Sequence, residues 1–132
     1  MDNLHLVAIV TAVALMVYVW MGLRVGAARR ASGIAAPAMS GDPMLERHLR
    51  VQGNTLEWLP IFIPSLWLFA LYFGQLAAAG VGLVWIAGRI VYALGYAAEP
   101  RRRAAGFGIQ FLACAVLLFG VLGKAALSAL SH

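Results

Sequence analysis

The sequence is dominated by four apolar stretches, each long enough to cross a membrane as a helix. They cover about residues 4–23, 45–73, 81–98 and 104–130. A membrane-spanning helix needs roughly 20 mostly apolar residues, and backbone groups in lipid must be hydrogen-bonded within the segment. With 63% hydrophobic and 11% charged residues, the chain is too apolar for a water-soluble domain of 132 residues. We therefore expect an all-α, four-helix membrane bundle forming a single domain over residues 1–132.

Arginines are concentrated in the first and third of the expected connections. Three follow the first helix, two open the second and three join the last two: Arg24, Arg29, Arg30, Arg47, Arg50, Arg101, Arg102 and Arg103. The expected connection over 74–80 is uncharged, whereas the one over 26–43 is rich in Ala, Gly, Ser and Pro. Basic loops favour the cytoplasmic side, so we expect both termini of this multi-pass protein to lie away from the cytoplasm. The small size and the absence of an additional targeting segment favour a bacterial inner membrane. This topology accounts for the charge of +5 without a nucleic-acid partner.

The start of the second helix carries an unusual polar face. Arg47, Arg50, Asn54 and Glu57 are separated by three, four and three residues, which places them within an arc of roughly 80° at helical periodicity. One interpretation is a set of local ion pairs with arginines reaching toward lipid headgroups. Asn54 and Glu57 lie deeper and need buried partners, which favours a binding site.

A second polar face lies on the third helix, where Arg89, Tyr92 and Tyr96 are again separated by three and four residues. The tyrosines are also typical of a membrane-interface belt. Arg89 lies deeper in the membrane and needs a counter-charge. Glu57 is the acidic candidate, so a structural Glu57–Arg89 pair remains an alternative to a ligand-binding role for Glu57.

Three consecutive arginines, Arg101 to Arg103, follow Pro100 at the start of the fourth helix. Positive charge at a helix N-terminus opposes the helix dipole. The arginines are explained either as a topology signal or as part of an anion site. The single cysteine, Cys114, lies in the apolar part of this helix without a partner, so we expect neither a disulfide nor a metal site.

These motifs together resemble the MAPEG family, the membrane-associated proteins in eicosanoid and glutathione metabolism. The resemblance extends from Ala28-Arg29-Arg30 to the start of the fourth helix. Its most specific part is Arg47-x-x-Arg50-x-Gln52-x-Asn54-x-x-Glu57-x-x-Pro60. A second part is Arg89-x-x-Tyr92-x-x-x-Tyr96, followed at the family's spacing by Arg103.

The resemblance implies a homotrimer with a glutathione site at each subunit interface, near the cytoplasmic side. By position, the glutathione-binding residues would be Arg50, Asn54, Glu57, Tyr92 and Tyr96, with Arg30 and Gln52 contributed across the interface. Arg103 would stabilise the glutathione thiolate as the catalytic residue. Trp58 would also belong to the glutathione-binding residues, but it stands where a family member has tyrosine, so a hydroxyl contact to the ligand is expected to be missing. Arg47 and Arg89 would be supporting structural residues.

The chemistry of glutathione is compatible with these residue types. Glutathione has two carboxylates, one ammonium and one thiol, which arginines, a carboxylate and tyrosine hydroxyls can bind. The expected activity is transfer of glutathione to a lipophilic electrophile that arrives from the lipid, or peroxide reduction by the same thiolate. The alternatives are a non-catalytic lipid-binding scaffold of the same family and a small transporter. A transporter commonly has internal repeats, and the sequence has none that we recognise.

Overall fold

The computed structural model describes residues 3–132 and is all-helical over that range. Its elements are α1 (His5–Ser32), α2 (Pro43–Phe73), α3 (Gln75–Ala98), the short 3-10 helix η1 (Pro100–Arg102) and α4 (Arg103–Leu130). The four long helices of this described range are each apolar and long enough to cross a membrane. The predicted all-α membrane fold is confirmed.

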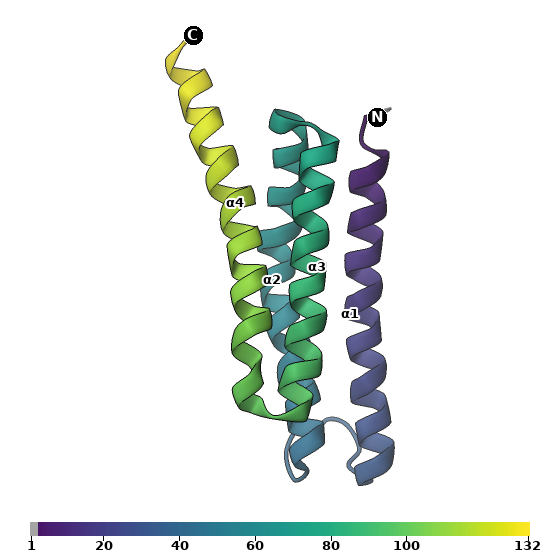
Figure 1. Ribbon diagram of the computed structural model, residues 1–132. Coiled ribbons are helices and arrows are strands. Elements are labelled where there is room, and N and C mark those ends of the chain that lie inside the picture. The colour runs from purple at the N-terminus through teal and green to yellow at the C-terminus, as the bar shows by residue number, and fades with distance from the viewer. Residues whose placement is uncertain (1–2) are drawn as a thin grey trace.

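The helices run up and down, so the two ends of the chain lie at the same end of the bundle (Figure 1). The α1–α2 connection and η1 lie at the opposite end. Helices α2 and α3 are both central, because each packs against the other three long helices. Helix α4 follows α3 closely at its start and leans away from the bundle toward its C-terminus (Figure 1).

Helix α1 is longer than predicted. We expected it to end near residue 23, but it continues to Ser32 and ends at Gly33, which has a left-handed φ of 74°. The extra segment is rich in alanine and arginine, both strong helix formers. Its Val25 and Ala28 are buried against Leu45 of α2, so tertiary packing also favours the extension. The connection to α2 is therefore confined to residues 33–42.

Helix α2 begins with two features of a helix N-terminus. The Asp42 carboxylate accepts a hydrogen bond from the Leu45 amide at 2.9 Å, and Pro43 occupies the first turn. Pro60 and Pro64 lie inside the helix, where the bundle can accommodate their missing amide hydrogens. The predicted bounds of α2 are close to those observed.

Helix α3 starts six residues earlier than predicted, at Gln75 instead of residue 81. The segment that we interpreted as a connection is alanine-rich and helical, and only Gly74 separates α2 from α3. Gly74 has a φ of 95°, which a residue with a side chain rarely adopts. Gly74 and Gly80 stand at the two ends of this segment, but its interior is alanine-rich, and alanine favours helix.

Glycines bring α3 and α4 together near the end of the bundle that contains η1. Gly106 of α4 lies against the backbone of Tyr92, and Gly88 of α3 lies against the backbone of Gln110. A Cβ atom at either glycine would meet main-chain atoms that cannot move aside. Deeper in the bundle, Phe62 and Trp85 stack with ring centroids 3.9 Å apart. The close α3–α4 approach fixes where α4 begins relative to the tyrosines of α3.

Candidate functional site

A cavity of about 790 Å³ opens between α2, α3 and the start of α4. Small-molecule sites typically have volumes of roughly 300–1,000 Å³. Five of the predicted site residues line this one cavity: Arg50, Asn54, Tyr92, Tyr96 and Arg103. They are separated by up to 53 positions in sequence, so the fold brings them together.

On α2 and on α3, the residues that line the cavity lie one helical turn apart and therefore share a helix face. Arg50 and Asn54 are one turn apart on α2, and Tyr92 and Tyr96 are one turn apart on α3. Arg103 is the first residue of α4, directly after η1. Because Gly106 allows α4 to approach Tyr92 closely, the Arg103 side chain reaches the tyrosine face of α3.

The tyrosines form an aromatic wall of the cavity. Their ring centroids are 5.7 Å apart, and the Arg103 guanidinium carbon lies 5.8 Å from the centroid of the Tyr96 ring. Tyr92 is only 3% exposed. The Arg103 side chain also donates a 3.4 Å hydrogen bond to the Pro100 carbonyl. An arginine and two phenolic groups therefore face the same space, which suits an anionic ligand.

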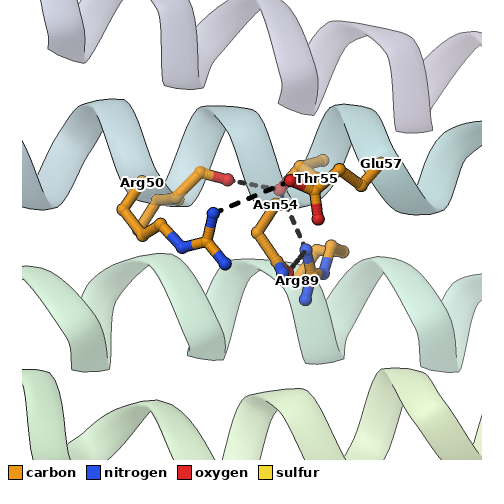
Figure 2. A network of polar contacts seen from close by, with 6 residues as sticks. Arg50, Asn54, Thr55, Glu57 and Arg89 are labelled. Atoms are coloured by element: carbon orange, nitrogen blue, oxygen red, sulfur yellow. Dashed lines mark hydrogen bonds and ion pairs between the residues drawn. The ribbon is translucent and has the colours of Figure 1, made fainter.

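The structure does not contain the Glu57–Arg89 pair that we considered. Arg89 donates from Nη1 to Asn54 Oδ1 at 2.9 Å and to Thr55 Oγ1 at 3.1 Å (Figure 2). At about 100° per residue, Glu57 lies roughly 160° around α2 from Thr55. Since Thr55 faces α3, Glu57 points elsewhere.

Glu57 pairs with Arg50 on its own helix instead. The Arg50 Nη1 to Glu57 Oε1 distance is 3.7 Å, and the side chains are 57% and 60% exposed. Glu57 does not line the main cavity but borders a neighbouring cavity of about 410 Å³, which Arg50 also lines. Arg50 thus lies between the two cavities: it pairs with Glu57 at the smaller one and lines the larger one together with Tyr92 and Tyr96.

Three other predicted ligand residues lie outside the main cavity of this chain. Arg30 is exposed near the end of α1, and the Gln52 side chain lies near Gly22 of α1. Trp58 packs edge-on against Phe107 and Phe111, with ring centroids 5.7 and 5.8 Å apart. Arg30 and Gln52 were expected to act on the site of a neighbouring subunit, and that expectation stays a prediction.

Arg47 has a structural contact, because its guanidinium donates a 3.0 Å hydrogen bond to the Ala97 carbonyl at the end of α3. The sequence did not single out Thr55, although its buried hydroxyl is part of the Arg89 network. Nor did it assign Phe107 to the cavity that it lines, whereas Arg101, which also lines the cavity, was one of the arginines considered for an anion site. Phe107 lies one helical turn after Arg103, and this spacing could have predicted that Phe107 lines the same cavity.

Across residues 3–132, no three His, Cys, Asp or Glu side chains come together as a metal site.

Comparisons with known proteins agree with the resemblance seen in the motifs. The sequence model of the MAPEG family matches residues 7–123. An uncharacterized protein of Synechocystis sp. is 45% identical over 115 residues, covering 87% of this chain and 84% of that protein. Microsomal glutathione S-transferase 2 of Homo sapiens is 39% identical over 124 residues, covering 93% and 84%. Leukotriene C4 synthase of Bos taurus is 35% identical over 131 residues, covering 99% and 85%.

Proposed function

The chain belongs to the MAPEG family, and on this premise we propose that it is an integral membrane glutathione transferase. The observation that carries the proposal is the convergence of Arg50, Asn54, Tyr92, Tyr96 and Arg103 on one cavity. Its relatives include proteins named as a microsomal glutathione S-transferase and a leukotriene C4 synthase. Glutathione is the co-substrate in this proposal, and no metal takes part.

The residues of the site match the groups of glutathione. Arg50 binds a carboxylate through charge-assisted hydrogen bonds, and the Asn54 amide and the tyrosine hydroxyls bind further polar groups of the tripeptide. Glu57 pairs with Arg50 and borders the neighbouring cavity that Arg50 also lines. It binds the ammonium group where glutathione extends past Arg50 toward this second cavity. The 790 Å³ of the cavity is within the range of sites for ligands of this size.

Arg103 supplies the catalytic effect. A thiol with a pKa of about 8.5 is mostly protonated at pH 7, and the thiolate is the nucleophile. Lowering the pKa by about two units requires about 2.7 kcal/mol of preferential stabilisation of the thiolate. A guanidinium next to the sulfur in a partly dry site can provide this by Coulomb attraction. The thiolate then attacks a carbon of a lipophilic electrophile, and a thioether forms as a halide leaves or an epoxide C–O bond opens. Alternatively, two molecules of glutathione reduce a hydroperoxide to an alcohol and water and are oxidised to glutathione disulfide.

The site is completed by a second copy of the chain. We propose a homotrimer in which Arg30 and Gln52 of one subunit reach the cavity of the next. The electrophile enters from the surrounding lipid, past the apolar side chain of Phe107 at the cavity wall. The arginine-rich end of the bundle faces the cytoplasm, and the termini face the other side, in a bacterial inner membrane.

The proposal is tested by ultraviolet difference spectroscopy of the thiolate and by turnover with glutathione. The substrates are an aryl halide, a hydroperoxide and a leukotriene-type epoxide. At pH 7, Arg103→Gln should lose most of the thiolate signal and most of the turnover, while calorimetry still detects glutathione binding. Arg102→Gln is the matched control, because Arg102 is next in sequence, 70% exposed and paired with Glu99. Unchanged turnover in Arg103→Gln refutes the catalytic assignment of Arg103. If the unmodified protein does not bind glutathione, the transferase proposal is wrong and the non-catalytic lipid-binding scaffold is the function that then fits the family.

A further inference from the structure

Arg89 is a fully buried arginine that lies behind the cavity. It is 0% exposed, and it is not among the residues that line the cavity. Figure 2 shows its side chain extending from α3 to Asn54 and Thr55 on α2. Ionisable residues at such positions are costly to bury and are commonly retained for function.

The contact with Asn54 fixes the orientation of an amide in the site. Asn54 accepts from Arg89 Nη1 through Oδ1 at 2.9 Å. A guanidinium can only donate, so the amide oxygen must face Arg89. The amide NH₂ group is then the part of Asn54 left to donate to a ligand in the cavity that Asn54 lines.

Thr55 holds Arg89 in place for this contact. Its hydroxyl donates to the Val51 carbonyl at 2.9 Å and accepts from Arg89 Nη1 at 3.1 Å. Thr55 is 1% exposed. Because its single proton is committed to Val51, the hydroxyl oxygen is fixed as an acceptor toward Arg89.

Arg89 also touches the second wall of the cavity. Its guanidinium carbon lies 4.4 Å from the centroid of the Tyr92 ring, a cation–π distance. Arg89 therefore contacts two cavity-lining residues, Asn54 and Tyr92, from the side opposite the ligand space.

The ion pairs of residues 3–132 do not include Arg89. They join Arg50 with Glu57, and Arg101 and Arg102 with Glu99. A buried arginine bound only by neutral oxygens is a poor way to stabilise a bundle. We propose that Arg89 is a positioning residue, which orients the Asn54 amide for glutathione without touching glutathione itself. This inference rests on the proposed function.

The test is a double-mutant cycle with glutathione affinity measured by calorimetry on detergent-purified full-length protein. Arg89→Lys retains the positive charge but removes the planar guanidinium, so a loss of affinity reports geometry and not charge. Asn54→Ala removes the amide that Arg89 orients. Loss of one hydrogen bond to a charged ligand group weakens binding about tenfold.

We expect Arg89→Lys to weaken glutathione binding by about three- to tenfold alone and by less than about twofold in the Asn54→Ala background. Losses that multiply in the double variant, or wild-type affinity in Arg89→Lys, overturn the inference. If Arg89→Lys does not fold, Thr55→Val replaces it in the same cycle with the same criteria. If the parent protein does not bind glutathione, the proposed function is overturned as well. If the parent protein binds glutathione and the affinity losses of the two single variants multiply in the double variant, only the role of Arg89 is overturned.

Discussion

Gly106 of α4 lies directly against the backbone of Tyr92 of α3. This contact sets the separation of the two helices where the cavity begins, three residues beyond Arg103. A main-chain neighbour cannot rotate away as a side chain can. The geometry that brings Arg103 to the tyrosines therefore depends on the absence of a side chain at residue 106.

Gly106→Ala should separate α3 from α4 and destabilise the bundle. Overpacking of this kind costs about 1–3 kcal/mol, so we expect a lower thermal midpoint and a loss of glutathione binding. Gly123→Ala on the same helix is the control, since a Cβ there meets nothing within 4 Å. The control should retain the midpoint or raise it, because alanine favours helix by about 1 kcal/mol over glycine. Equal midpoints for the two variants would contradict the assigned packing role.

The contact between Glu57 and Arg50 leads to a second prediction. An exposed ion pair contributes about 0–1 kcal/mol, so Glu57→Gln should leave thermal stability nearly unchanged. If Glu57 binds the ammonium of glutathione, the variant should bind glutathione about tenfold more weakly, the loss expected for a charge-assisted hydrogen bond. A glutathione analogue without the amino group should bind the variant and the parent protein equally, as calorimetry can measure. An equal loss for both ligands would show that Glu57 does not recognise the ammonium.

The sequence predicted the polar faces better than the ends of the helices. Residues three or four apart share a helix face whatever the tertiary fold, so Arg50 with Asn54 and Tyr92 with Tyr96 were correctly grouped. The end of α1 and the start of α3 were misplaced because we interpreted segments that contain glycine as connections, although their alanines favour helix. Val25 and Ala28 extend α1 by packing on Leu45.

The partner of Arg89 could not be derived from spacing either. Charge alone suggested Glu57, but the rotation of α2 about its axis brings Asn54 and Thr55 to Arg89. That rotation is set by packing across the whole bundle. Arg30 is part of α1, and the Gln52 side chain lies near Gly22 of α1, so neither lines the main cavity. Their roles in a neighbouring subunit stay predictions.

The role proposed for Arg103 predicts a specific pH dependence. The guanidinium stabilises the charged thiolate, so it lowers the thiol pKa, and turnover should rise with pH through that lowered pKa. In Arg103→Gln, the rise should shift upward by about two pH units, toward the free-thiol value of about 8.5. At pH 7 the thiolate fraction would fall roughly 25-fold. The measurement is the pH profile of turnover at saturating glutathione, and Arg102→Gln should retain the parent profile.

The proposed shared site predicts complementation between two inactive variants. Arg50 lines the main cavity of its own chain, whereas Arg30 lies outside it. If Arg30 serves the neighbouring subunit, Arg30→Ala and Arg50→Ala should each lose glutathione binding as homo-oligomers. Mixed oligomers made by co-expression should recover about a quarter of the sites, those in which both arginines are intact. If both arginines instead serve the same subunit, every site in a mixed oligomer lacks one of them. Co-expression would then restore no glutathione binding, and the intersubunit role of Arg30 would be wrong.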